Sequence, residues 1–238
     1  MTTPPDSSSL VEVADGVWTV PAPLRFFGVQ INTRMSVCKL ADGGIVLIGP
    51  VSHSDALAAS VDAVGPVRAI IAPNLLHHLY VGEWMAAYSG ARSFAAKGVA
   101  AKRPELSFSA TLGPAYDEVF GAEVERFPID GMPRLNESLF VHHGSRTLIA
   151  TDFCFYMPEA KGFAAVFAAL MGVRKKVRVE PIFKAWIKDK TAFRASLLPL
   201  RALQIDHLSM CHHEVISGDA TATLQAVLDQ VKVPPRGS

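Results

Sequence analysis

The sequence has no marked excess of charge of either sign and contains little cysteine. Among its 238 residues, Lys and Arg number 23 and Asp and Glu number 22, which gives a formal net charge of +1. Proteins that neutralise nucleic-acid phosphates usually carry a basic excess, so this balance argues against nucleic acid as the main partner. The three cysteines are widely spaced and form no Cys-x-x-Cys pair. We therefore expect free thiols in a reducing, cytoplasmic location.

Long apolar runs and several catalytic signatures are also missing. Residues 162–173 form the longest apolar run, which falls well short of the roughly 20 residues that a membrane span needs. The first ten residues have neither the basic nor the apolar region of a signal peptide. The patterns G-x-x-x-x-G-K-[ST] and G-x-S-x-G do not occur. These absences argue against a membrane-spanning protein, a P-loop protein and a serine hydrolase with that motif.

The composition favours one well-packed domain. Half of the residues are hydrophobic and 19% are charged, which supports a sizeable core and is unlike a disordered chain. We expect a single domain over residues 10–232. The Pro/Ser/Thr-rich residues 1–9 predict a disordered N-terminal segment, and residues 233–238 predict a flexible tail.

Turn signals and hydrophobic periodicity predict alternating strands and helices. Asp15-Gly16 and Asp42-Gly43-Gly44 each separate two short apolar runs, which is typical of β-hairpins. Further runs predict strands at 67–72, 91–95, 138–141, 146–150 and 208–211, and helices at 54–64, 75–88, 97–103, 163–171, 192–203 and 220–231. This order indicates two halves, each a sheet with helices on one face, packed as a four-layer αββα sandwich of the α/β class.

The same order of elements resembles the metallo-β-lactamase fold family over nearly the whole chain. Four segments carry the resemblance: Asp42-Gly43-Gly44 before an apolar strand, residues 73–78 where the family has H-x-H-x-D-H, Asp152 at a strand end, and His212 after the last strand. The string Ala72-Pro73-Asn74-x-x-His77-His78 is similar to an uncharacterised branch of that superfamily. The resemblance implies the four-layer fold and metal-dependent hydrolysis.

The chain departs from the family in one half of the metal site. Pro73 and Leu75 occupy the H-x-H positions, and neither has a donor side chain. Residues 131–137 match the loop that supplies a third ligand to the first metal, and they contain no histidine. The resemblance therefore implies one metal, zinc or iron, at the second position only. The residues that match this position are His77, which stands where the family has Asp, His78, Asp152 and His212.

The residue types agree with a mononuclear site. Imidazoles and a carboxylate can bind zinc or iron with a position left open for water, and zinc lowers the pKa of such a water to about 7. We expect His78, Asp152 and His212 as ligands, with His77 as a fourth ligand or a general base. His77 and His78 can both serve only if they lie in a turn before the helix. A competing hypothesis is that His78 and Asp152 hydrogen-bond to each other in a site that has lost its metal.

Several neighbouring residues have more than one interpretation. Glu137 is a catalytic base, a ligand, or a solvated carboxylate at a strand edge. Asn74 is a ligand or, as we favour, a helix N-cap. Cys154 and Cys211 lie near the expected ligands in the sequence, but no base or cation pattern accompanies them, so we expect small core residues.

We expect a metal-dependent hydrolase that acts on a small-molecule ester, lactone or amide. The alternative is a non-catalytic protein that keeps the fold and binds a small molecule or a partner. The segment 162–173 is apolar on every helical face and is followed by basic residues. It predicts a lid over the pocket or a homodimer contact, in preference to contact with a membrane surface.

Overall fold

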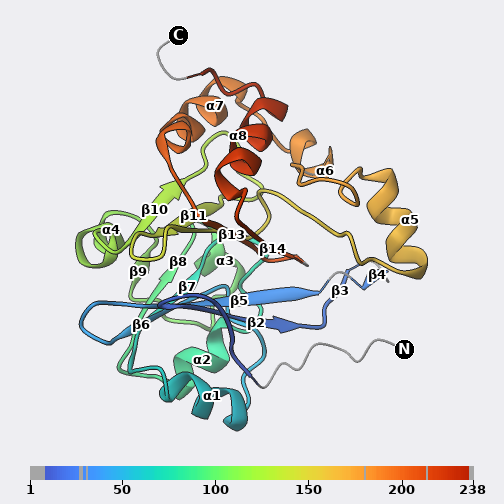
Figure 1. Ribbon diagram of the computed structural model, residues 1–238. Helices are drawn as coiled ribbons and strands as arrows, with labels where there is room; N and C mark the ends of the chain where they lie inside the picture. The colour runs from blue at the N-terminus through green and yellow to red at the C-terminus, as the bar shows by residue number, and fades with distance from the viewer. Residues whose placement is uncertain (1–8, 27–28, 31, 180, 213, 236–238) are drawn as a thin grey trace.

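Two mixed β-sheets form the centre of the molecule (Figure 1). The computed structural model describes residues 9–26, 29–30, 32–179, 181–212 and 214–235. The first sheet has the order β1-β2-β5-β6-β7-β8-β9, with antiparallel pairs as far as β6 and parallel pairs beyond it. Its strands are β1 (Val11–Ala14), β2 (Val17–Ala22), β5 (Thr33–Lys39), β6 (Ile45–Ile48), β7 (Val67–Ala72), β8 (Arg92–Ala95) and β9 (Ala110–Thr111).

The second sheet has the order β10-β11-β12-β13-β14, and its parallel pair is β12 with β13. Its strands are β10 (Val124–Pro128), β11 (Ser138–His142), β12 (Thr147–Ala150), β13 (His207–Met210) and β14 (Val215–Ser217). A separate hairpin pairs β3 (Arg25–Phe26) with β4 (Val29–Gln30). The helices are α1 (Asp55–Asp62), α2 (Val81–Ala87), α3 (Val99–Lys102), α4 (Pro114–Phe120), α5 (Gly162–Leu170), α6 (Pro181–Ala185), α7 (Lys190–Leu197), the 3₁₀ helix η1 (Leu198–Ala202) and α8 (Ala220–Gln230).

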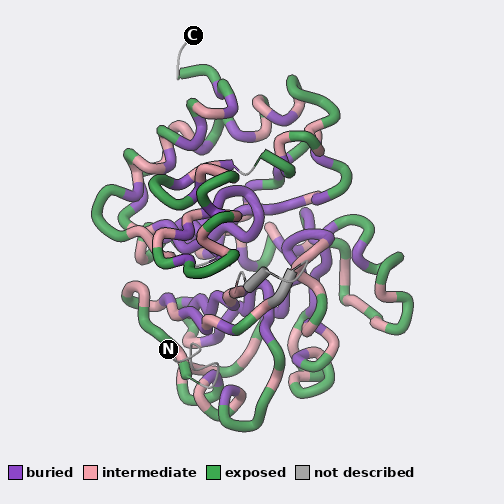
Figure 2. The backbone as a smooth tube through the Cα atoms, turned by 90° about the vertical axis from the view of Figure 1, so that its right-hand side faces the viewer, coloured by how far each residue is buried: buried purple, intermediate pink, exposed green. Residues whose placement is uncertain are grey.

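Three apolar cores separate four layers. Phe94 of the first sheet and Phe140 of the second belong to the core between the sheets. Leu57 and Trp84 place α1 and α2 against the outer face of the first sheet, and buried residues of α7 and α8 cover the outer face of the second. In Figure 2, the buried residues are concentrated toward the middle of the molecule and the exposed residues lie mostly at its periphery. The predicted four-layer αββα sandwich is confirmed.

Strand β6 shows why a continuous apolar run folds as a strand here. Ile45 and Leu47 face the core under α1 and α2, whereas Val46 and Ile48 face the core between the sheets. Successive side chains of a strand point to opposite faces, so a strand covered on both faces needs an apolar residue at each position. The predicted hairpin that joins β5 to β6 turns at Asp42-Gly43-Gly44. There, Oδ1 of Asp42 accepts a hydrogen bond from the N–H of Gly44 at 2.8 Å.

Helix α2 begins later than the sequence pattern predicts. Residues 74–80 form turns, and the helix covers Val81–Ala87. The side-chain oxygen of Asn74 accepts hydrogen bonds from the N–H groups of Leu76 and His77, at 2.8 and 2.7 Å. Asn74 therefore closes an Asx turn and does not cap a helix. His77 and His78 both lie in this turn before the helix, so helical spacing does not fix the directions of their side chains.

Helix α5 stands at the edge of the molecule, next to β4 (Figure 1). Phe163 is 71% exposed and Leu170 is 75% exposed, whereas Ala168 is buried. The helix is apolar on all faces but is enclosed on only one. Self-association through residues 162–173 stays a prediction. In the described part of the chain, no helix is long and apolar enough to cross a membrane.

The two chain ends predicted to be loose fall mostly outside the described residues, which exclude 1–8 and 236–238. Within the predicted tail, Val233 is buried, and its carbonyl oxygen accepts a hydrogen bond from Nη2 of Arg201 at 2.6 Å. The packed structure therefore extends at least one residue beyond the expected end of the domain.

Candidate metal centre

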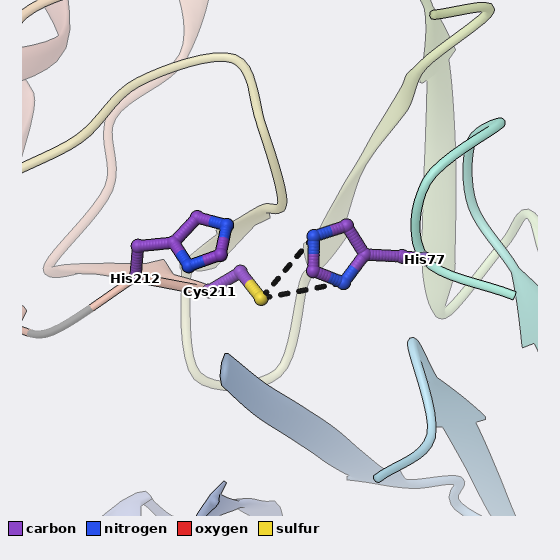
Figure 3. A group of neighbouring side chains, drawn as sticks. All are labelled: His77, Cys211 and His212. Atoms are coloured by element: carbon purple, nitrogen blue, oxygen red, sulfur yellow. Dashed lines mark hydrogen bonds between the residues drawn. The ribbon is translucent and has the colours of Figure 1, made fainter. Parts of the chain in front are cut away.

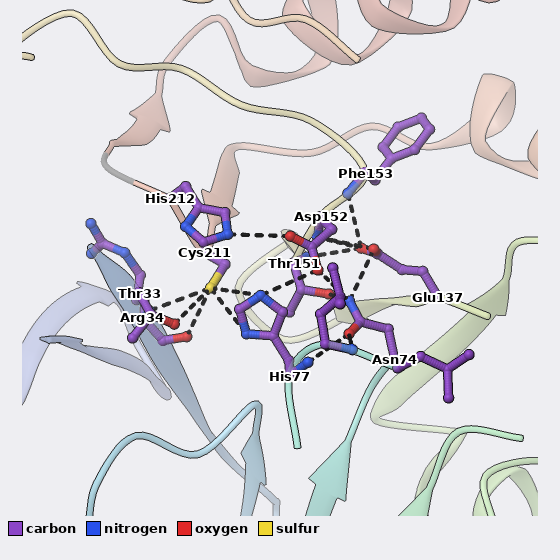
Figure 4. Close-up of polar contacts among 12 residues, drawn as sticks. Thr33, Arg34, Asn74, His77, Glu137, Thr151, Asp152, Phe153, Cys211 and His212 are labelled. Carbon is purple, nitrogen blue, oxygen red and sulfur yellow. Dashed lines mark hydrogen bonds and ion pairs between the residues drawn. The ribbon is translucent and has the colours of Figure 1, made fainter. Parts of the chain in front are cut away.

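Three loops that follow strands bring titratable side chains together. His77 follows β7 of the first sheet, Asp152 follows β12 of the second, and Cys211 and His212 follow β13. Figure 4 shows these side chains pointing toward one another. Sites in α/β proteins are commonly built at the carboxyl ends of strands, and the parallel pairing of β12 with β13 places two of these loops side by side.

His77, Cys211 and His212 form a compact group of metal-ligand types (Figure 3). One ligand atom from each residue lies within 4.8 Å of the other two. Sγ of Cys211 is 3.5 Å from Nδ1 and 3.6 Å from Nε2 of His77, and the centroids of the two imidazole rings are 5.4 Å apart. These three residues could hold a metal ion.

The carboxylate of Asp152 lies between the two imidazoles. Its Oδ2 is 3.3 Å from Nε2 of His77, and its Oδ1 is 3.2 Å from Nε2 of His212. Burial alone would raise the pKa of Asp152, but the charges and hydrogen bonds of the two histidines outweigh it and hold that pKa well below its usual range. Burial alone would lower the pKa values of His77 and His212, but Cys211 and Asp152 raise both above the ordinary value.

The orientation of His212 is fixed from both sides. Nδ1 lies 2.7 Å from the carbonyl oxygen of Asn32, so Nδ1 carries the hydrogen and donates it, since a carbonyl oxygen only accepts. Nε2 then faces a carboxylate oxygen, which requires either a second proton or a metal ion on that nitrogen. A backbone carbonyl that accepts from the far nitrogen is the usual support of a metal-binding histidine. The ring also stacks on Phe155, with centroids 4.8 Å apart.

Cys211 belongs to the site, although the sequence pattern predicted a core residue. Sγ lies 3.2 Å from Oγ1 of Thr33 and accepts a hydrogen bond from the N–H of Arg34 at 3.4 Å. Burial alone would raise the pKa of Cys211, but the charges of His77 and His212 lower it to about 7. The one sequence signal for a role of Cys211 in the site was its position at a strand end directly before His212. The groups that hydrogen-bond to its thiol come from β5, which is far away in the sequence.

Asn74 and Glu137 hold Asp152 in place (Figure 4). Nδ2 of Asn74 donates to Oδ2 of Asp152 at 2.8 Å and to Oγ1 of Thr151 at 2.9 Å. The carboxylate of Glu137 accepts hydrogen bonds from the N–H groups of Thr151, Asp152 and Phe153, at 2.9 to 3.1 Å. Burial and the charge of Asp152 raise the pKa of Glu137 to about 7. Glu137 is 1% exposed, so it supports the loop from beneath and is not a solvated strand-edge residue.

The structure places His78 apart from the expected ligand set. Its Nδ1 atom is buried and has no hydrogen-bond partner among the described residues. Burial and the nearby charges of Lys102 and Arg103 lower the pKa of His78. His77 lies against Asp152 and His212, and Cys211, in place of the expected His78, completes the group of metal-ligand types.

A cavity of about 430 Å³ adjoins this centre. His77, Asp152 and His212 line it, together with apolar side chains that include Phe167 of α5, Ile182 and Phe183 of α6, and Leu75, Leu76 and Leu79 of the turn before α2. Glu137 and Cys211 are not among its lining residues. A small molecule in the cavity can therefore reach the two imidazoles and the carboxylate. Glu137 cannot be reached from the cavity, so its role is to position Asp152 and not, as the sequence suggested, to transfer protons.

Replacing Glu137 tests this positioning part. We expect Glu137→Gln to lower the free energy of unfolding by about 2–3 kcal/mol, because the amide hydrogens then face the N–H of Asp152 and the Nδ2 of Asn74. Urea denaturation measures the change. Glu118→Gln, at an exposed position of α4, should change stability by less than about 0.5 kcal/mol. An equally small effect at both positions would contradict the role of Glu137.

The pH dependence of stability tests the histidine pair. The raised pKa values of His77 and His212 stabilise the metal-free fold below the ordinary value of about 6.5, and this contribution is lost as pH rises through the folded-state values. We expect the denaturation midpoint of metal-free protein to decrease as the pH is raised from neutral to alkaline. His212→Gln should reduce the fall, whereas His143→Gln, at an exposed position, should keep it. Identical pH profiles for wild type and His212→Gln would refute the assignment.

The fold matches solved metallo-β-lactamases along almost the whole chain. A metallo-β-lactamase from Pontibacter korlensis is 12% identical, with a TM-score of 0.59 over 93% of this chain and 98% of that chain. DIM-1 metallo-β-lactamase, in a structure exposed to ceftazidime, is 12% identical, with a TM-score of 0.63 over 94% and 97%. FIM-1 from Pseudomonas aeruginosa, in its mono-zinc form, is 10% identical, with a TM-score of 0.61 over 95% and 96%. At these identities the likeness shows the fold alone.

Comparison of sequences identifies the family. No curated protein matches the chain significantly. The family model described as a domain of unknown function, DUF4336, matches residues 14–180, which include His77, Glu137, Asp152 and helix α5. The chain therefore has a metallo-β-lactamase fold and belongs to the DUF4336 family.

Proposed function

We propose that the protein is a hydrolase with one metal ion, held by His77, Cys211 and His212, that acts on an ester, lactone or amide. The observation that carries this proposal is the convergence of these three ligand types around the carboxylate of Asp152 at the wall of a cavity. Hydrolysis adds water across the acyl bond and releases an acid together with an alcohol or an amine.

The donor set fits zinc. Imidazole nitrogen and thiolate sulfur are the common zinc ligands in proteins, and a pKa of about 7 gives Cys211 substantial thiolate character at neutral pH. His212 keeps its hydrogen on Nδ1, toward Asn32, and presents Nε2. FIM-1, which shares the fold, has been solved in a mono-zinc form. Iron is the alternative metal, and elemental analysis distinguishes the two.

We assign a separate role to each residue of such a site. A zinc ion would supply a Lewis acid and lower the pKa of water there. Catalytic zinc sites keep one position open, so we assign three ligands to His77, Cys211 and His212. Asp152, beside both Nε2 atoms, then orients the attacking water by accepting its hydrogen bond. Glu137 and Asn74 hold Asp152 in that position.

The state of the thiols supports a reducing compartment, for which we propose the cytoplasm. All three cysteines are free and buried. Burial raises the pKa of Cys38 to about 12 and raises the pKa of Cys154 further. These two thiols remain protonated and inert at neutral pH, in contrast with Cys211.

One observation favours a second candidate, a non-catalytic protein that binds a small molecule. Both oxygens of Asp152 already have partners, since His77 and Asn74 contact Oδ2 and His212 contacts Oδ1. A network that is satisfied by protons alone can persist without a metal. This candidate predicts a metal-free protein whose ligand binding is unchanged when Asp152 is replaced by Asn.

Elemental analysis of protein purified without a metal-affinity tag separates the two candidates. The proposed hydrolase should contain about one zinc or iron per chain. Cys211→Ser and His212→Ala should each weaken zinc binding by more than about 100-fold. This exceeds the 10–100-fold cost of losing a residue that only hydrogen-bonds to a metal ligand. The exposed variant His143→Ala should bind zinc like wild type. Metal-free protein that also fails to take up added zinc would rule out the metal site and favour the second candidate.

Hydrolysis of 4-nitrophenyl esters tests the part assigned to Asp152. Asp152→Asn keeps the size of the side chain but orients water poorly, so we expect kcat to fall by about 100-fold or more while the metal content stays near that of wild type. Glu118→Gln is the control and should leave kcat unchanged. Metal-loaded wild-type protein without measurable hydrolysis of any ester, lactone or amide tested would contradict the hydrolase.

A further inference from the structure

The cavity beside the metal centre is lined mainly by hydrocarbon. Its volume of about 430 Å³ lies within the range of small-molecule sites, about 300–1,000 Å³. Met157, Val173 and Phe183 are buried residues of its wall. Charged and imidazole groups occur at two places, the metal centre and the part where His78 and the exposed Lys102 reach the lining. Most of the surface offered to a ligand can therefore make only apolar contacts.

One wall is a segment of the connection after β12 whose two ends pair with each other. The N–H of Phe155 donates to the carbonyl of Arg178 at 2.9 Å, and the N–H of Arg178 donates to the carbonyl of Phe155 at 3.1 Å. The N–H of Met157 donates to the carbonyl of Val173 at 2.9 Å. These bonds close an excursion, residues 155–178, that carries α5. Its lining side chains are all apolar: Phe155, Met157, Phe167 and Val173.

A row of aromatic rings begins beside the metal centre in this segment and continues into α6. Phe155 stacks on His212, with centroids 4.8 Å apart, and Phe183 of α6 stacks on Phe155 at 5.5 Å. Trp186 meets the ring of Phe183 edge-on at 4.9 Å. Ile182, also in the lining, is 47% exposed. The apolar wall is therefore elongated, and it runs from the imidazole of the centre to the solvent.

We propose that this cavity binds the hydrocarbon chain of an acyl ester or amide whose carbonyl lies at the metal centre. The position of the carbonyl rests on the proposed function, whereas the binding of the chain does not. A short acyl group would contact only part of the apolar wall, whereas a chain of medium length can be removed from water along most of its length, which is the main source of apolar affinity. The substrate class is thus medium-chain acyl compounds, in preference to acetyl compounds.

Binding of straight-chain primary alcohols, from butanol to decanol, tests the chain site without chemistry. Calorimetry on the protein as purified, at alcohol concentrations below aggregation, should show the affinity rising about fourfold for each added methylene until the cavity is full. Phe167→Glu and the half-exposed Ile182→Glu should each weaken octanol binding by about tenfold or more. Phe163→Glu places the same charge on the outer face of α5 and should leave octanol binding unchanged.

The outcomes separate this inference from the hydrolase. Affinity that does not depend on chain length, or that falls equally in Phe163→Glu, overturns the chain site. Alcohols that bind as expected, with no ester hydrolysed, support the chain site and count against the proposed function. Esters hydrolysed with the same kcat/KM for acetate and octanoate, by protein that binds no alcohol, support the hydrolase and overturn the chain site.

Discussion

The buried carboxylate of Asp152 is the charge around which the neighbouring loops are arranged. A carboxylate removed from water is costly unless charges and hydrogen bonds compensate it. Here two imidazoles flank its oxygens, and the amide of Asn74 donates to one of them. Glu137 in turn holds the backbone of residues 151–153. Loss of a single partner from such a buried group commonly costs about 3–5 kcal/mol, so the contacts that shape the site also stabilise this part of the fold.

The four-layer fold supplies the positions for this cluster. Parallel pairing of β12 with β13 sets the loops of Asp152 and His212 side by side, and β7 of the other sheet delivers His77. The excursion with α5 and the segment with α6 then surround the same residues with apolar walls. A polar centre next to an apolar cavity can hold a ligand with two unlike ends, because each end finds surroundings of its own kind.

Much of the architecture follows from local patterns in the sequence. Gly16 and Gly43 adopt positive φ angles of 77° and 84° in the predicted hairpin turns, and apolar runs mark the central strands. The strand ends also predicted that Asp152 and His212 would approach the turn that holds His77. The position of Cys211 directly before His212 was the one signal for its part in the site, and its partners on β5 are brought to it by tertiary structure alone. Likewise, the burial of Glu137 depends on how residues 151–153 fold over it. For α5, helical periodicity does not predict how much of the helix surface is covered by neighbouring segments.

The central claim is that the two imidazoles and the thiol beside Asp152 form one metal site. X-ray absorption spectroscopy at the metal edge, on protein purified without a metal-affinity tag, tests it most directly. The account predicts nitrogen neighbours at about 2.0–2.1 Å and one sulfur at about 2.3 Å from zinc, with the sulfur lost in Cys211→Ser. A metal surrounded by oxygen and nitrogen alone, with a spectrum that Cys211→Ser does not change, would contradict it.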